Sequence, residues 1–397
     1  MSHHKAFKFR LHPSKAQASL INRTIGCTRF VFNHFLAQQK KKDAYWHMTE
    51  EMVQNGQLPM NNWKSGFFQK FTSIKELPEL KKQAPFLKEV DSIALQKAVE
   101  NLHDAYERYY KKQNKAPHFK SKRNPVQAYT TKCVNGNIAI DSNKVKLPKL
   151  GWIRFAKSRE VEGRILNATI RKAPSGKYYI SIVAEVNIQP MEPVHKEVGI
   201  DLGIKEFAVL SDETKAPNHH FLVRMEQRIA KEQRTLSRRT IGSSNWRKQK
   251  IVVARLHEKI TNARMDFLHK LSTQVVKTHD LIAIEDLRIA IMVKNKTLSK
   301  HISDVAWGEF RRMLTYKAEW YGRKVVVVSP WYASSQLCSA CGHQHKETKN
   351  LSVRQWTCPG CGSLHDRDHN ASQNLLNEAR RLLTDKKTAG TAGIACS

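Results

Sequence analysis

The hydrophobic pattern near the start of the chain changes from a strand period to a helical period. Residues 6–11 alternate apolar and polar side chains, as expected for a strand that is buried on one face. From residue 20 to residue 106 the apolar positions follow a helical spacing, interrupted by a polar region at residues 55–64. The basic, Pro-containing segment 111–125 ends this pattern. We therefore predict one strand followed by a helical module.

Short β-type runs separated by turns cover residues 129–188. The last two runs flank Pro174-Ser175-Gly176, which predicts a hairpin. The strand at residues 6–11 has no partner near it in the sequence. We expect it to pair with these later strands in a small β-barrel or sheet, which makes the helices between them an insertion.

The rest of the chain alternates strands with helices. The strand patterns are a hairpin at residues 198–211 with its turn at 203–206, and runs at 281–287 and 324–330. The helical patterns lie at residues 224–277 with a break at 242–244, at 305–321 and at 370–383. We predict a multidomain α+β protein with an α/β layer in its C-terminal half and a disordered tail at residues 386–397.

The charge of the chain predicts a polyanionic partner. Lys and Arg number 68 against 35 Asp and Glu, a formal charge of +33, and nucleic acid is the obvious polyanion. A membrane partner is not expected, because the sequence has no apolar run of about 18 residues, no secretory signal and no clear basic amphipathic helix. We expect a cytoplasmic or nuclear protein.

Four of the seven cysteines form two close pairs. Cys338 and Cys341 are separated by two residues, as are Cys358 and Cys361, and a glycine follows each pair. This spacing lets two thiolates of one tight turn reach the same Zn²⁺, and four thiolates leave no open coordination position. We predict a structural zinc site, in preference to disulfides or unpaired thiols. The histidines around the cysteines, His343, His345 and His365, we expect to be surface groups.

Three carboxylates are candidates for a second metal site. Asp201 and Glu285 follow apolar strand patterns, and Asp368 stands where the last helix begins. Acids from separate strands can share divalent cations such as Mg²⁺, which offsets their desolvation. Each acid also has an ordinary interpretation: Asp201 as a turn residue, Glu285 as the partner of a basic side chain, and Asp368 as a helix cap. The rival candidates are Asp286, Asp304 and Asp366.

Several motifs together resemble the TnpB family of transposon-encoded nucleases, relatives of the type V CRISPR effectors. They are GIDLGI at residues 199–204, IEDL at 284–287, the two CxxCG pairs, and HDRDxNAxxN at 365–374. The resemblance runs along nearly the whole chain, and the order acid, acid, zinc ribbon, acid is far more specific than any single motif.

The resemblance implies a fold, an activity and partners. It implies an RNase H-like (RuvC) nuclease core at residues 193–335 and 365–385 and a zinc ribbon at 336–364. It also implies a wedge β-barrel at 1–12 and 116–192 that carries a helical recognition lobe at 13–115. Asp201, Glu285 and Asp368 would hold two Mg²⁺ ions and catalyse the hydrolysis of double-stranded DNA beside a short flanking motif. The partners would be target DNA and a guide RNA from the transposon end. One copy of the chain would bind one guide RNA. The protein would work in a prokaryotic cytoplasm.

Nucleic-acid contacts are predicted from charge and from the resemblance. Gln96 is the best candidate for a base contact with the flanking motif, because its amide can pair with an adenine edge. The densest basic stretch should contact phosphates, although a solvated helix face is the alternative. The candidates in this stretch are Arg228, Lys231, Arg234, Arg238, Arg239, Arg247, Lys248 and Lys250.

Three other functions remain open at this point. A nuclease-inactive guided DNA-binding repressor would keep the fold and the guide. An unguided RNase H-like transposase would share the fold and the metal chemistry. A zinc-ribbon protein that only binds nucleic acid would need none of the three acids.

Overall fold

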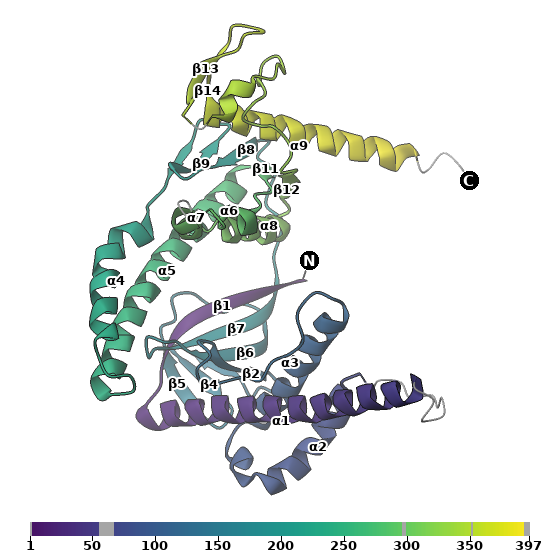
Figure 1. Ribbon diagram of the computed structural model, residues 1–397, viewed down its shortest axis with the longest axis vertical. Helices are drawn as coiled ribbons and strands as arrows, with labels where there is room; N and C mark the ends of the chain where they lie inside the picture. The colour runs from purple at the N-terminus through teal and green to yellow at the C-terminus, as the bar shows by residue number, and fades with distance from the viewer. Residues whose placement is uncertain (1, 55–66, 296–298, 351, 393–397) are drawn as a thin grey trace. The chain divides into compact units, whose positions relative to one another are not determined.

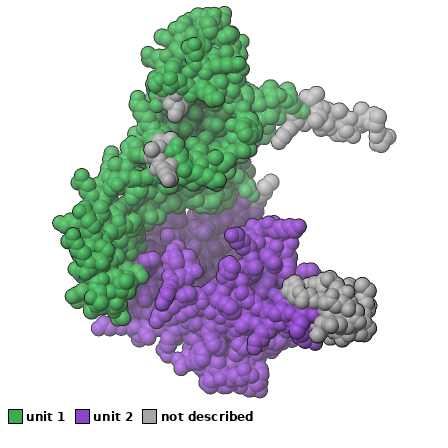
Figure 2. Space-filling model, in the orientation of Figure 1, with its two compact units in different colours: residues 1, 188–397 green, residues 2–187 purple. Residues whose placement is uncertain are grey.

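The computed structural model describes residues 2–54, 67–295, 299–350 and 352–392. The chain divides into two compact units, residues 2–187 and residues 188–397 together with Met1, which Figure 2 colours separately. The predicted polar interruption at residues 55–64 and the end of the predicted tail lie outside the described residues. Each unit is described by itself.

The unit of residues 2–187 is built on a seven-stranded antiparallel sheet with the order β2-β6-β7-β1-β5-β4-β3. Its strands are β1 (Ser2–His12), β2 (Gln127–Lys132), β3 (Ala139–Asp141), β4 (Lys144–Leu147), β5 (Gly151–Phe155), β6 (Arg164–Lys172) and β7 (Tyr178–Asn187). β1 pairs with β7 and β5, which confirms that the first strand joins the later ones. We expected a small β-barrel or a sheet. The strand pairing gives a sheet, whose edge strands are β2 and β3.

The helices of this unit form an insertion between β1 and β2, as predicted. They are α1 (Lys15–Gln54), α2 (Lys70–Gln83), the 3₁₀ helix η1 (Pro85–Glu89) and α3 (Ser92–Tyr110). Their apolar faces share one core, in which Phe35 of α1, Leu87 of η1 and Leu95 of α3 are fully buried. The Asp91 side chain caps α3 by accepting a hydrogen bond from the backbone N–H of Ile93.

The unit of residues 188–397 contains a five-stranded sheet with the order β10-β9-β8-β11-β12. Its strands are β8 (Glu197–Leu202), β9 (Glu206–Leu210), β10 (Lys215–Pro217), β11 (Leu281–Glu285) and β12 (Lys324–Val328). β8 and β9 form the predicted hairpin, while β8, β11 and β12 are parallel. The carboxyl ends of β8, β11 and β12 therefore meet at one edge of the sheet.

Six α-helices accompany this sheet in the described residues (Figure 1). They are α4 (Phe221–Ser237), α5 (Ser244–Thr278), α6 (Ile289–Met292), α7 (Ser299–Val305), α8 (Trp307–Tyr321) and α9 (Arg367–Ala392). The break between α4 and α5 confirms the predicted interruption at residues 242–244. α9 continues to Ala392, beyond the expected end at residue 383 and into the segment expected to be disordered. No described helix is long and apolar enough to cross a membrane.

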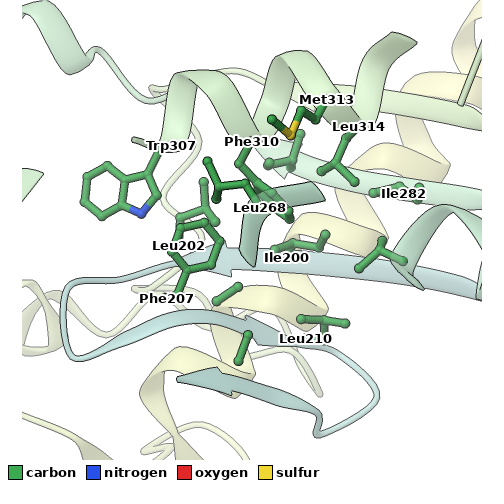
Figure 3. Packing of buried hydrophobic residues seen from close by; sticks show 14 of the residues in the cluster. Ile200, Leu202, Phe207, Leu210, Leu268, Ile282, Trp307, Phe310, Met313 and Leu314 are labelled. Carbon is green, nitrogen blue, oxygen red and sulfur yellow. The ribbon is translucent and has the colours of Figure 1, made fainter. Parts of the chain in front are cut away.

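Alternation along β8 and β11 gives the sheet two different faces. Ile200 and Ile284 point into a large core that contains Leu268 of α5 and Phe310 of α8, and Figure 3 shows Ile200, Leu268 and Phe310 packed together. On the opposite face Ala283 packs against Leu375 and Ala379 of α9. The odd-numbered residues of both strands therefore face α9.

A glycine lets α9 come close to β8. A Cβ atom added to Gly199 would lie 1.9 Å from the backbone oxygen of Ser372, a distance that no side chain could tolerate. The first glycine of the GIDLGI motif thus permits direct backbone packing of the helix on the strand. This contact sits two residues before Asp201, on the same face of the sheet.

The cysteine-containing segment lies between β12 and α9. Its regular elements are η2 (Lys346–Lys349) and the antiparallel pair β13 (Gln355–Thr357) and β14 (Leu364–Asp366). Trp356, Cys338 and Cys358 form its small buried core. A segment this small cannot bury much apolar surface, so it depends on a cross-link or a metal for stability.

Candidate active site and cysteine cluster

Two of the predicted acids lie side by side on parallel strands. The register of β8 and β11 pairs Ile200 with Ile284, so Asp201 and Glu285 are the next residues along each strand. Neighbouring strands are about 4.8 Å apart, and residues at matching positions point to the same face. Both acids therefore face α9, and Asp201 is a strand residue, paired in the ladder with Val209, and not a turn acid.

The third acid stands in the first turn of α9. Asp366, not Asp368, caps the helix: its Oδ1 accepts hydrogen bonds from the backbone N–H groups of Asp368 and His369, at 3.1 and 3.0 Å. The capping interpretation of Asp368 is therefore wrong. Asp368 lies in the first turn of the helix that packs on Gly199, on the face of the sheet that carries Asp201 and Glu285.

Electrostatics links the three carboxylates. Burial, followed by the charges of Asp368 and Glu285, raises the pKa of Asp201 to about 8, although the nearby Arg367 opposes this shift. Burial and the adjacent Asp286 also raise the pKa of Glu285. Such shifts arise where like charges are gathered in a poorly solvated place, which is typical of functional sites.

The rival acids have structural partners. Asp286 forms an ion pair with Arg311, and Asp304 pairs with Arg264 while accepting a hydrogen bond from the backbone N–H of Leu222. Glu285, in contrast, has no ion-pair partner among the described residues, so its interpretation as the partner of a basic side chain is not supported. Glu285 therefore differs from the rival acids in having no arginine to neutralise it among the described residues.

Arg354 is a residue that sequence reasoning missed. It belongs to the cysteine segment, and its Nη1 lies 3.2 Å from Oδ2 of Asp368. Arg367, buried beside Asp201, was also missed. The HDRD motif contains Arg367 and was a usable signal, whereas nothing in the sequence pairs Arg354 with Asp368.

The structure brings the four predicted cysteines together. Their Sγ atoms all lie within 4.8 Å of one another, with Cys338 and Cys361 at 3.7 Å and Cys341 and Cys358 at 3.6 Å. A Zn²⁺ ion bound to four thiolates at about 2.3 Å would place the sulfurs about 3.8 Å apart at the corners of a tetrahedron. Disulfides require about 2.0 Å. The arrangement fits a tetrahedral metal ion.

His365 is not the surface group that we expected. Its Nε2 lies 3.0 Å from Sγ of Cys338, and its ring lies 4.9 Å from that of Trp356. Burial lowers the pKa of His365, which favours a neutral ring that can donate an N–H to the thiolate. The side chain therefore links the cysteine cluster to the start of α9.

Two asparagines of the HDRDxNAxxN motif fasten α9 to the same segment. Asn370 accepts a hydrogen bond from the backbone N–H of Ser339 and donates one to the carbonyl of Leu337, at 2.9 and 2.7 Å. Asn374 donates to the carbonyls of Leu337 and Ser334. The cysteine segment and the helix that carries Asp368 thus form one hydrogen-bonded assembly.

The predicted phosphate-binding residues lie on α4, α5 and the loop between them. Seven of the eight are exposed, and Arg239 is half-buried, with its guanidinium donating to the carbonyl of Asn245. Among the described residues none of the eight is paired with a carboxylate. The acids of α4 are engaged elsewhere, Glu226 with Lys300 and Glu232 with Gln249. This surface therefore keeps its positive charge.

Gln96 is exposed on α3, where its amide can reach a partner outside the protein. Ala94 and Ala98 on the same helix line a pocket of about 170 Å³, together with the polar side chains of Lys120 and Asn124. The base contact predicted for Gln96 stays a prediction.

Comparison with known proteins identifies the family. A putative RNA-guided DNA endonuclease of Streptomyces pristinaespiralis is 35% identical over 99% of this chain and 90% of that protein. The chain belongs to the TnpB family. A second relative, the putative RNA-guided DNA endonuclease InsQ of Escherichia coli (strain K12), is 33% identical over 99% of this chain and 94% of its own length. "TnpB-like" proteins of Acanthamoeba polyphaga mimivirus match about half of this chain, 52%.

Family profiles match three parts of this TnpB-family chain. A profile described as "Probable transposase" matches residues 181–296, "Cas12f1-like, TNB domain" matches 307–375, and "Helix-turn-helix domain" matches 1–44. In residues 2–44 the structure has strand β1 followed by the single helix α1, so the last description does not fit the fold of this region.

A solved structure shares the fold. The protein in the "Cryo-EM structure of the Cas12f1-sgRNA-target DNA complex" superposes with a TM-score of 0.54 at 11% identity, over 94% of this chain and 98% of that one. The TnpB-family chain therefore has a Cas12f1-like, mixed α/β fold.

The raised pKa of Asp201 predicts a pH-dependent cost of folding. Between its unfolded value near 3.9 and about 8 this carboxyl holds a proton only in the folded state, so stability falls as pH rises through this range. In buffer without Mg²⁺, Asp201→Asn should raise the melting temperature relative to the unsubstituted chain, and the gain should grow from pH 5 to pH 8.5. Calorimetry would measure it. Glu213→Gln, an exposed acid outside the cluster, is the control, and an equal gain at every pH would contradict the prediction.

Proposed function

We propose that this chain is a transposon-encoded, RNA-guided DNA endonuclease whose catalytic residues are Asp201, Glu285 and Asp368. The observation that carries the proposal is the convergence of these three acids from two parallel strands and one helix end, with a pKa of about 8 at Asp201. Negative charge that the neighbouring arginines neutralise only in part is suited to divalent cations. The names of the relatives, putative RNA-guided DNA endonucleases, support the same activity.

The three acids are arranged for phosphodiester hydrolysis in a RuvC-like core. Two Mg²⁺ ions, when bound, would activate a water and stabilise the leaving oxygen of the cut strand. Asp201 and Glu285 are fixed by the strand ladder, so their carboxylates need little reorganisation. Asp368 is held by the helix that Asn370 fastens, and Arg354 orients its carboxylate by an ion pair. Geometry held by rigid elements is what such catalysis requires.

The cysteine cluster serves a different metal. Cys338, Cys341, Cys358 and Cys361 would hold one structural Zn²⁺, with His365 donating to the Cys338 thiolate. The role of this zinc ribbon is to fix the position of α9, and so of Asp368. Zinc takes no part in the chemistry.

The other parts of the chain would bind the guide RNA and the target DNA. Residues 1–12 and 116–192 are the wedge and residues 13–115 the recognition lobe, where Gln96 contacts the motif flanking the target. The exposed cations of α4 and α5, from Arg228 to Lys250, would hold phosphates, which suits recognition by backbone and not by base. One copy of the chain would bind one guide RNA.

Loss of the acids gives the decisive test. The protein copurified with its RNA should linearise a plasmid that carries the matching target, in the presence of Mg²⁺ and not of EDTA. Asp201→Ala, Glu285→Gln and Asp368→Asn should each lower the rate by roughly a thousandfold, because each removes a ligand that is needed only for the chemical step. Gel-based cleavage kinetics would measure these rates.

A control variant and the outcomes that the rival functions predict complete this test. Asp212→Asn should cleave within a few fold of the unsubstituted chain. A guided repressor predicts target binding without cleavage by any form, and an unguided transposase predicts no defined RNA when the copurified nucleic acid is sequenced. Cleavage that survives Asp201→Ala would remove the proposed active site.

Zinc content tests the ribbon. The purified chain should contain about one zinc per molecule, and Cys358→Ser should lose it because a three-thiolate site binds more weakly. Hydrogen exchange should then become faster at the start of α9, since Asn370 and His365 no longer hold it. Cys133→Ser, a cysteine outside the cluster, is the control. Equal zinc in both variants would contradict the assignment.

Salt dependence tests the basic helices. Replacing Arg234, Arg238 and Lys248 together by Ala should weaken RNA binding and reduce the slope of log K against log salt by about 2 to 3, roughly one per lost phosphate contact. Filter binding over a range of KCl concentrations would measure the slope. Lys270→Ala on α5, the helix that carries Lys248, is the control, because Lys270 already pairs with Asp266. An unchanged slope would mean that these cations do not contact phosphates and belong to an ordinary solvated helix face.

A further inference from the structure

An exposed tryptophan lies beside the proposed active site. Trp331 is 76% exposed, whereas Trp307 and Trp356 in the same unit are buried, at 3% and 6%. The guanidinium of Arg288 lies 4.4 Å from the centre of its ring. One exposed ring is not by itself evidence of a site, but a tryptophan with a cation over its ring offers a large aromatic surface to a flat partner.

Hydrogen bonds to Ser329 fix the backbone turn that carries Trp331. The backbone N–H of Trp331 donates to the Ser329 hydroxyl, and that of Tyr332 donates to the Ser329 carbonyl, at 3.3 and 3.1 Å. The Tyr332 side chain packs against the small core that contains Val328 and Leu375. Trp331 is therefore displayed by an anchored turn.

Arg288 and Trp331 leave the sheet at the same edge as the acids. Glu285 pairs with Val328 at the ends of β11 and β12. Arg288 comes three residues after Glu285, and Trp331 three residues after Val328. Three residues of extended chain span at most about 10 Å, so this pair stands next to the acid cluster.

The chemistry of the pair favours an unpaired nucleobase. Arg288 has no carboxylate partner among the described residues, so its charge remains available to a phosphate while its plane covers one face of the indole. The ring keeps an exposed face on which a base can stack, as aromatic side chains do in proteins that bind single strands. A base inside a duplex cannot offer its face in this way.

We propose that Trp331, backed by Arg288, is a stacking platform for one unpaired base of the DNA strand that enters the acid cluster. This inference rests on the proposed nuclease function and deepens it. The platform fixes the strand on one side of the scissile phosphate. Because every base has a flat face on which it can stack, the platform would bind single-stranded DNA without sequence preference.

Photocrosslinking tests the platform without any cleavage. Single-stranded DNA that carries 5-iododeoxyuridine at successive positions would be bound to the RNA-loaded Asp201→Ala protein in EDTA and irradiated. One position should crosslink to the peptide that contains residue 331, and the additional change Trp331→Ala should abolish this crosslink. Trp152→Ala, which removes an exposed tryptophan from β5, should leave it intact. Absence of the crosslink in the presence of DNA binding would overturn the proposal.

An abasic scan tests the same contact during cleavage. In the unsubstituted chain, removing the base at the crosslinked position should slow cleavage roughly five- to hundredfold, as expected for one lost stacking contact. Trp331→Ala should be equally slow on the intact strand but insensitive to the abasic site, whereas Trp331→Phe should stay within about threefold. Equal sensitivity in Trp331→Ala would refute the platform.

The outcomes separate this inference from the proposed function. If the unsubstituted chain cleaves and Asp201→Ala does not, the nuclease stands, and the abasic scan decides the role of Trp331. If nothing cleaves, the crosslink still decides whether Trp331 contacts DNA. A change in oligomeric state on Trp331→Ala, with crosslinking at other residues only, would assign the ring to a contact between copies of the chain and overturn the proposal.

Discussion

The close backbone contact between α9 and β8 is the constraint on which the C-terminal unit depends. Gly199 leaves room for the carbonyl of Ser372, and this approach brings the first turn of the helix to the face that carries Asp201 and Glu285. A side chain at position 199 would push the helix away and separate Asp368 from the other two acids. The glycine of the GIDLGI motif is therefore a packing requirement that also keeps Asp368 near the other two acids.

The same contact gathers three carboxylates in one poorly solvated place, where their negative charges repel one another. Burial and the charges of Asp368 and Glu285 raise the pKa of Asp201, and the protein offsets the gathered charge only in part, with Arg367 beside Asp201 and Arg354 beside Asp368. The rival acids Asp286 and Asp304 are fully engaged with arginines, which shows that the fold can neutralise carboxylates where it needs to. Incomplete neutralisation of this kind is typical of functional sites, and it supports the cation site that we propose.

Much of this was predictable from local pattern. The hairpin at residues 198–211, the strands β11 and β12 and the pairing of β1 with later strands all follow from apolar periodicity, because one buried face dictates it. The four cysteines converge because their spacing fits one ion. Composition and spacing alone favoured Asp368 as a helix cap, and the error has a clear cause: the cap lies two residues earlier, at Asp366, a shift that periodicity cannot resolve.

Contacts between distant segments could not be predicted from the sequence. Arg354 reaches Asp368, His365 reaches Cys338, and Arg288 covers Trp331, and each of these pairs joins two different segments of the chain. These contacts join the cysteine cluster to the acid cluster. The ribbon holds α9 through Asn370, and α9 holds Asp368, so the four thiolates govern the geometry of an acid that they do not touch. The structural metal that we propose, which the sequence inserts between the second and third acids, would thus act on the proposed catalysis through position alone.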